Sequence, residues 1–197
     1  PSKCDSGYTL FMGRQIGAIL INMNGKVVRQ WKDFMGMPCK MIKGGHILGS
    51  LAARDAAIAS QDFADVTMID WDGNVEWTFN KYDHVNDPDG IEWAARQHHD
   101  YQMEGNPVGY PVPGQEVTPD FGKMLILTHK DVNKPKISPH QLLDDCVIEI
   151  DREGSILWEW SVIDHFNEFG FTEEQKNAMY RDPTMRPTGQ GDLFHIN

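Results

Sequence analysis

Two short stretches of this chain combine histidine with polar neighbours, and both could do chemistry. One is 98–101 (HHDY) and the other is 195–197 (HIN). In an extended strand residues i and i+2 share a face, so His195 and Asn197 would present an imidazole and a carboxamide side by side. Such a pair suits hydrogen bonding to an oxyanion. We therefore predict catalytic roles for His195 and Asn197.

A recurring spacing connects the histidines with a cysteine. Cys39 and His99 are each followed six residues later by a glycine, Gly45 and Gly105. The same pattern begins again at His195. Cys39, His99 and His195 would then occupy the same station of successive repeats, and equivalent stations of a circular fold point toward one axis. We predict that His99 is catalytic together with His195.

Neighbouring side chains of a strand point to opposite faces, so only one of two adjacent histidines should face that axis. The repeat selects His99. Other residues close to these stations in sequence are candidates for binding a substrate or anion. These predicted substrate-binding residues are His98, Asp100, Tyr101, Arg96, Trp93 and Cys39.

Three segments must position these residues, and they share one pattern. In 18–31, 66–77 and 147–160 an apolar run leads into a glycine turn and then into a second run that ends on tryptophan. Glycine supplies the positive φ of a tight turn, and β-branched and aromatic residues flank it in alternation. Each segment is predicted to be a β-hairpin.

The repeats predict an all-β protein, made of about three blades of a six-bladed β-propeller. The turn glycines are 48 residues apart (Gly25 to Gly73) and then 81 (Gly73 to Gly154), which fits blades with lengthening inserts. An open antiparallel meander or sandwich is the alternative. The prediction is one incomplete domain, 1–197, with repeats at about 8–60, 61–145 and 146–197.

Such a propeller would have to be completed by a second chain or by a C-terminal part of a longer precursor. Asn197 could be the site of cleavage in that precursor, because an asparagine side chain can attack its own carbonyl. Insert loops are expected at about 86–98, 105–122 and 161–190. The last includes a helix over 172–180, with Thr172 as its N-cap. On a propeller these loops would wall the mouth of the channel.

Composition excludes some classes of protein. The formal net charge is −11, from 18 basic and 29 acidic residues, and no basic stripe is visible, which argues against nucleic acid as a partner. No apolar run is long enough to predict a membrane span. Three scattered cysteines do not form a disulfide framework, so a reducing compartment such as the cytoplasm is slightly favoured.

The same histidines have a competing use as metal ligands. Neutral imidazoles from successive blades could bind zinc or another transition metal, with His129, His140 and Asp145 completing the site if the fold brought them together. No closely spaced ligand signature supports this. We therefore expect no cofactor, with a metal as the alternative.

Four blocks of sequence together resemble the bacterial arylsulfotransferase family. They are 7–11 (GYTLF), the turn 23–28 (MNGKVV) that leads to Trp31, His99-Asp100 with the later Gly105-Asn106, and 191–197 (GDLFHIN). The resemblance implies a six-bladed propeller that moves a sulfuryl group between phenols through a sulfated histidine. It also implies that His99, His195 and Asn197 hold the sulfuryl oxygens.

The family likeness places the nucleophilic histidine beyond Asn197, and a periplasmic location would follow if the likeness extended to targeting. We therefore expect an enzyme that binds an oxyanion in a histidine-lined channel and transfers a sulfuryl group between phenolic substrates. Its partners would be a second chain with the C-terminal half of the propeller and a small aromatic substrate. A propeller hydrolase or lyase acting on a small aromatic or carbonyl compound, or a non-catalytic binding scaffold, remains an alternative.

Overall fold

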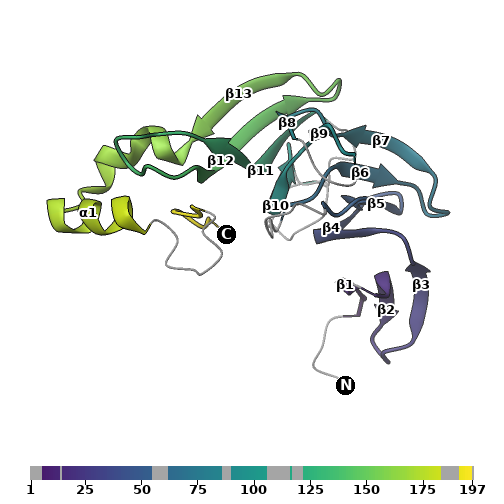
Figure 1. The fold of residues 1–197 in the computed structure, drawn as a ribbon. Coiled ribbons are helices and arrows are strands. Elements are labelled where there is room, and N and C mark those ends of the chain that lie inside the picture. Colours follow the sequence, from purple (N-terminus) through teal and green to yellow (C-terminus); the bar gives the residue numbers. More distant parts are fainter. Residues whose placement is uncertain are drawn as a thin grey trace.

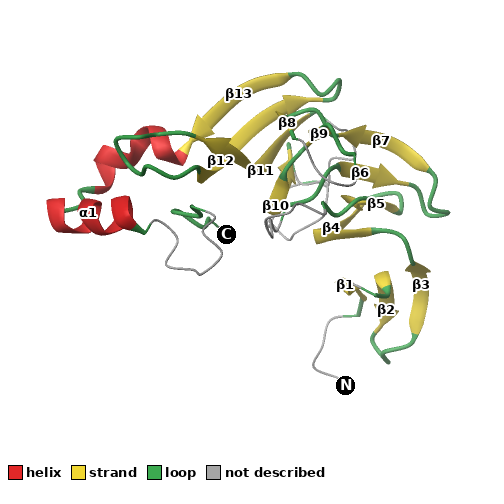
Figure 2. Ribbon diagram, viewed as in Figure 1, coloured by secondary structure: helices red, strands yellow, loops and turns green. Residues whose placement is uncertain are grey.

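A computed structural model of the chain describes residues 6–13, 15–54, 62–85, 90–105, 116, 122–182 and 191–196. These residues form an all-β protein with two short helical segments at one end (Figure 2). The fold class predicted from the sequence is thus confirmed at this level. Among the described residues no sheet closes on itself.

All but two of the described strands form three antiparallel sheets that follow one another along the chain (Figure 1). Sheet 1 contains β1 (Tyr8–Gly13), β2 (Gly17–Asn22) and β3 (Val27–Trp31). Sheet 2 contains β4 (Met35–Ile42), β5 (His46–Ser50), β6 (Val66–Ile69) and β7 (Val75–Phe79). Sheet 3 contains β10 (Gln97–Met103), β11 (Lys123–Val132), β12 (Leu142–Asp151) and β13 (Ile156–Ser161).

Shorter elements connect or follow these sheets. A two-stranded ribbon, β8 (Asp83–His84) with β9 (Trp93–Ala94), joins sheet 2 to sheet 3. After β13 come the 3₁₀ segment η1 (Val162–Phe169) and the helix α1 (Glu173–Arg181). Neither is long and apolar enough to cross a membrane, and the same holds for all helices that the structure describes.

The three predicted hairpins are confirmed as β2–β3, β6–β7 and β12–β13. Each turn places its glycine at positive φ, 73° at Gly25, 93° at Gly73 and 81° at Gly154, and the glycine N–H donates to the carbonyl three residues earlier. This is the geometry of a glycine bulge, which a residue with a Cβ adopts only under strain. An Asn or Asp three positions before each glycine accepts backbone N–H groups of the turn; these residues are Asn22, Asp70 and Asp151.

The hairpins end the sheets rather than begin them, so the expected phase of the repeats was wrong. Strands pair in the order in which they occur, and sheets 1 to 3 span 8–31, 35–79 and 97–161. The expected boundary after residue 60 separates β5 from β6 within sheet 2, and the boundary after residue 145 falls inside β12. The periodic turn locates a repeat, but it does not say which strand pairs first.

The sheets contact one another in a repeated way. Trp31 Nε1 at the end of sheet 1 donates to Trp71 O at 3.1 Å, and Trp77 Nε1 at the end of sheet 2 donates to Arg152 O at 2.8 Å. Both acceptors lie two residues before the turn glycine of the next sheet. A buried apolar cluster fills each gap between sheets, with Leu48, Met124 and Ile148 among its members in the second.

The first strands of the sheets lie on one side of this array. In Figure 1, β4 and β10 lie side by side, and Lys40 Nζ of β4 donates to Tyr101 O of β10 at 2.5 Å. At the other end, the predicted helix is confirmed. Thr172 caps α1 and forms a capping box with Gln175, since each side chain bonds to the other residue's backbone N–H.

The predicted insert loops fall into different kinds of structure. The range 86–98 includes β9 and the start of β10, and 161–190 includes η1 and α1. Most of 105–122 lies outside the described residues. The described part of the first insert is thus strand, and the described part of the third contains the predicted helix together with η1.

Candidate functional site

A bulge in β10 brings two histidines to one site. Residues 97–101 of β10 lie opposite only 126–128 of β11, so β10 carries extra residues, and His99 adopts a positive φ of 53°. A bulge breaks the strict alternation of a strand. The rings of His98 and His99 consequently lie 5.3 Å apart, centroid to centroid. The prediction that only one of them could reach the site was wrong for this reason.

Four histidines meet here, and we call them the histidine cluster: His98, His99, His129 and His195. The His98 and His129 rings stack, with centroids 3.6 Å apart and planes 13° from parallel. His99 Nε2 lies 2.8 Å from His195 Nε2, although 96 positions separate the two residues. The structure thus brings together the two histidines that the repeated station selected.

The segment 191–196 delivers His195 by attaching to sheet 3 and η1. Leu143 N in β12 donates to Gly191 O at 3.0 Å, which begins a short parallel bridge with Asp192. Phe194 stacks on Phe169 of η1, with ring centroids 5.0 Å apart. At the tip, His195 Nδ1 lies 3.1 Å from Asp192 Oδ2, so a carboxylate orients the imidazole. The His195 side chain remains 28% exposed.

Below the exposed pair lies a buried layer of charge. Asp145 of β12 is directly opposite His129 of β11, and its Oδ1 lies 3.0 Å from His98 Nε2 and 3.4 Å from His129 Nε2. On the other side of the ring, His129 Nδ1 lies 3.3 Å from Asp62 Oδ2. His98, His129 and Asp145, which we call the buried trio, are each no more than 1% exposed.

Two arginines hold Asp62 in place. Arg54 NH1 contacts both carboxylate oxygens, at 2.8 and 2.9 Å, and Arg96 Nε donates to Oδ2 at 3.1 Å. Arg96 also donates to Asp83 and Asp131, so its guanidinium is surrounded by three carboxylates and is 2% exposed. This geometry does not fit the predicted role of Arg96 in binding a substrate anion.

Burial and charge shift the pKa values of the site in opposite directions. Burial lowers the pKa of His98 and of His99, and the neighbouring His195 lowers that of His99 further. Burial would also lower the pKa of His129, but its contacts with Asp145 and Asp62 outweigh burial and raise it. The pKa of Asp62 is held well below its usual range despite burial, because His129, Arg96 and Arg54 stabilise the carboxylate.

The other predicted substrate-binding residues have separate surroundings. Asp100 pairs with Lys40 at 2.6 Å and accepts the Tyr101 N–H. Tyr101 is 2% exposed and donates its hydroxyl to Pro38 O, which makes it a core residue. Trp93 is exposed and packs edge-on against His84.

Cys39 is half-buried in β4, and burial raises its pKa to about 12. A neutral thiol at this position does not supply the anion contact that was predicted for it. Asn197, predicted to be catalytic, lies outside the described residues.

Sequence reasoning missed Asp62 and Asp192 and placed His129 and Asp145 only in a conditional metal site. Asp62 carries no local signal, because it arrives through the bridge of its neighbour Phe63 to Gln97. Asp192 had one available signal, its position three residues before His195. His140, the third member of the conditional metal set, is exposed, and its backbone N–H bonds to Ser138.

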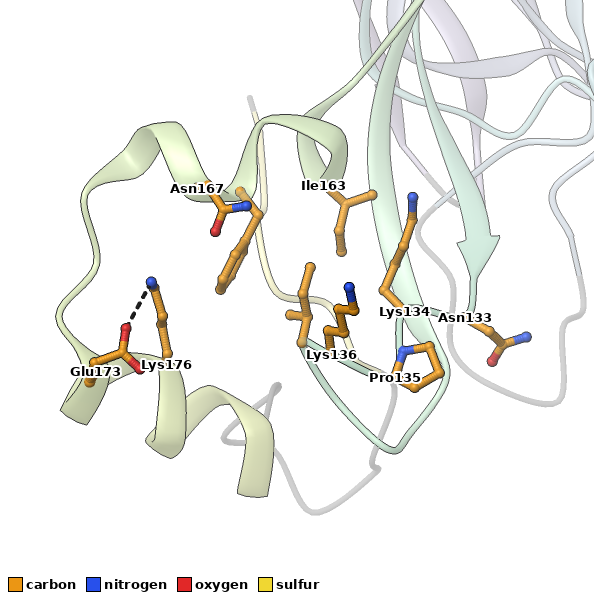
Figure 3. A pocket seen from close by; sticks show the side chains of 10 residues that line it. Asn133, Lys134, Pro135, Lys136, Ile163, Asn167, Glu173 and Lys176 are labelled. Atoms are coloured by element: carbon orange, nitrogen blue, oxygen red, sulfur yellow. Dashed lines mark hydrogen bonds and ion pairs between the residues drawn. The ribbon is translucent and has the colours of Figure 1, made fainter.

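A surface pocket of about 500 Å³ lies elsewhere, between the loop 133–137 and the helical segments (Figure 3). Its cations are partly neutralised, since Lys176 pairs with Glu173 at 3.0 Å and Lys134 with Asp164 at 2.6 Å. The residues that line it include no member of the histidine cluster. No protein-family model, curated protein or solved structure matches this chain significantly.

Proposed function

We propose that the chain is part of a β-propeller enzyme that transfers a sulfuryl group between phenols, with His99 and His195 as its oxyanion-binding pair. Three features support propeller architecture. The sheets follow one another in chain order, their first strands lie on one side, and the tryptophan bond from one sheet to the next turn recurs. Each four-stranded sheet would be one blade, with the remaining blades supplied by a second chain or by a further part of the protein.

One observation carries the functional proposal, the contact of 2.8 Å between His99 Nε2 and His195 Nε2. At this distance one nitrogen must donate a proton and the other accept it. Asp192 Oδ2 accepts the Nδ1 proton of a neutral His195, which leaves the lone pair of His195 on Nε2. His99 then donates. An anion that entered here would separate the two rings and let both nitrogens donate to it, which requires one added proton.

This proton balance fits sulfuryl transfer. In the first step the donor S–O bond breaks, a bond forms from sulfur to a histidine nucleophile, and His195 returns its extra proton to the leaving phenolate. In the second step the S–N bond breaks and an S–O bond forms to the acceptor phenol, whose proton passes to His195. As the S–O bond breaks, negative charge grows on the leaving phenolate oxygen, and the N–H donors of the site stabilise that charge. The resemblance assigns the nucleophile to a position after Asn197.

The first test measures binding of 4-nitrophenyl sulfate to this chain by calorimetry. Replacing His99 or His195 by alanine should weaken binding about 10- to 100-fold, the usual worth of a hydrogen bond to a charged group. His140→Ala is the matched control, because His140 is an exposed histidine outside the cluster. Equal binding by all four proteins would contradict the proposal.

The second test is transfer, assayed with the chain that supplies the other blades present. Sulfated acceptor should accumulate only when a phenol is added, and each cluster variant should lose about 10²–10⁴-fold in rate. Release of nitrophenol and free sulfate without acceptor would favour the hydrolase instead. Native mass spectrometry of the purified protein shows whether a second chain is bound. A folded monomer that catalyses transfer alone would exclude the need for a second chain.

A further inference from the structure

We propose that His98, His129 and Asp145 form a binding site for a divalent transition-metal ion of the zinc class. This site lies beneath the exposed His99–His195 pair and does not depend on the transferase proposal. Two imidazoles with one carboxylate are a common ligand set for zinc and for non-haem iron. One ligand atom from each of the three residues lies within 4.8 Å of the others.

The first support is a set of buried polar atoms without partners. His98 Nε2, His129 Nε2 and both carboxylate oxygens of Asp145 are inaccessible to solvent and have no hydrogen-bond partner among the described residues. Although His98 Nε2 and Asp145 Oδ1 are close, their directions do not satisfy a hydrogen bond. An unsatisfied buried polar group costs about 1–3 kcal/mol, and three of these atoms, His98 Nε2, His129 Nε2 and Asp145 Oδ1, lie close together, which favours a ligand at this place.

The spacing of these atoms matches a coordination sphere. Asp145 Oδ1 lies 3.0 Å from His98 Nε2 and 3.4 Å from His129 Nε2. Ligands about 2.0–2.1 Å from a tetrahedral zinc ion are about 3.3 Å from one another. The two observed separations lie on either side of that value.

The second support is the environment of His129. A histidine that binds a metal through one nitrogen usually donates its other N–H to a carboxylate, which orients the ring. His129 Nδ1 lies 3.3 Å from Asp62 Oδ2, and Asp62 is fixed in turn by Arg54 and Arg96. Arg54 pairs with Asp62, and Arg96 pairs with Asp62 and two further carboxylates, whereas Asp145 lies against His98 and His129.

The stacked rings define what must change when an ion binds. His98 and His129 are 13° from parallel at 3.6 Å, and two parallel rings cannot both direct an in-plane lone pair to one point. At least one ring must therefore tilt about its Cβ–Cγ bond. The ring centroid of His195 lies 6.2 Å from that of His98.

The test titrates the metal-free chain with Zn²⁺ by calorimetry and with Co²⁺ by visible absorption. We expect equimolar binding, d–d bands of a low-symmetry Co²⁺ site, and a rise in melting temperature that EDTA reverses. Asp145→Asn and His129→Gln should abolish equimolar binding. Asp62→Asn should weaken it about 10- to 100-fold, as expected for a residue that orients a ligand.

Controls separate this site from other causes. His140→Gln tests an exposed histidine, and His99→Ala tests the upper pair, which should lose the aryl sulfate but keep Zn²⁺. Circular dichroism shows whether each variant folds. Titration of the unaltered protein tests the proposal even where a variant fails to fold. Absence of equimolar binding of Zn²⁺ and Co²⁺ to the unaltered chain would overturn the proposal, as would unchanged binding by folded Asp145→Asn and His129→Gln proteins.

Discussion

The first strands of sheets 2 and 3 share a backbone irregularity and use it differently. In β4 the register against β5 shifts between Met35 and Lys40, and in β10 the register against β11 shifts between Gln97 and Tyr101. Cys39 lies in the first shift and His99 in the second. Both are followed six residues later by glycine, so the station predicted from the sequence corresponds to a bulge that both sheets contain.

Different surroundings follow from the side chains at these bulges. Cys39 packs against an apolar cluster that includes Trp31 and Phe34. The bulge of β10 instead faces His195 on its exposed side and Asp145 on its buried side. The bulge is common to β4 and β10, whereas the chemistry of each strand depends on the side chains placed in the bulge and on the distant segment that lies against it.

Replacing His99 by cysteine gives the bulge of β10 the same side chain as the bulge of β4. If the proposed transferase activity is right, His99→Cys should reduce sulfuryl transfer about 10²–10⁴-fold when the other blades are present, because a neutral thiol is a poor donor to an oxyanion. Cys39→Ser is the matched change in β4 and should leave the rate unchanged. Initial rates with 4-nitrophenyl sulfate and a phenol measure both. A comparable loss in Cys39→Ser would show that the β4 station also takes part.

The charge beneath the β10 bulge should dominate stability. Asp62→Ala leaves Arg96 and Arg54 buried with an incomplete set of partners, and it should lower the free energy of unfolding by about 3–5 kcal/mol. Asp131→Ala removes another partner of Arg96 at a position that is 49% exposed, and it should cost about 1 kcal/mol or less. Urea denaturation compares them. Equal losses would mean that burial of the network contributes little.

Thiol labelling tests whether Cys39 is a packed and unreactive residue. Burial raises the pKa of both Cys39 and Cys146 to about 12, well above the usual thiol value of about 8.5. Both thiols should therefore stay protonated at pH 8 and react slowly with iodoacetamide, and reaction should accelerate on unfolding in guanidinium. Peptide mapping follows each cysteine separately. Rapid labelling of Cys39 in the folded protein would contradict its assignment to a packed, inert station.

The smallest expected difference concerns the turns that close the sheets. Gly25→Ala should cost about 1 kcal/mol for the positive φ alone, because nothing lies within 4 Å of the added Cβ. Gly154→Ala should cost more, since its Cβ would lie 3.3 Å from Phe79 Cδ2 of sheet 2. Melting temperatures of the two variants measure this. A larger loss in Gly25→Ala than in Gly154→Ala would show that Phe79 moves away from the added Cβ at little cost.

Local sequence signals predicted the local structure. Glycine turns flanked by alternating apolar residues predicted the three hairpins, and Thr172 as N-cap predicted the start of α1. The phase of the sheets could not be predicted in this way. Residues 51–65 separate β5 from β6 in sequence, and no periodic pattern in the sequence marks the pairing of these two strands.

For the site, the repeated spacing predicted that His99 and His195 belong together, and the structure places their Nε2 atoms 2.8 Å apart. Nearness in sequence was a poor guide to the rest. Arg96 and Tyr101 lie close to His99 in the chain, yet Arg96 turns to three carboxylates and Tyr101 enters the core. His98 joined the site only through a bulge, whose register no short pattern specifies.

A double-mutant cycle on aryl sulfate binding tests the central claim most directly, namely that His99 and His195 act as one oxyanion-binding pair. Calorimetry would compare the unaltered chain with His99→Gln, His195→Gln and the double variant. If the pair holds one anion, the double variant should bind little more weakly than the weaker single variant, because groups in contact are not additive. Losses that multiply independently, or binding that no variant weakens, would contradict the account.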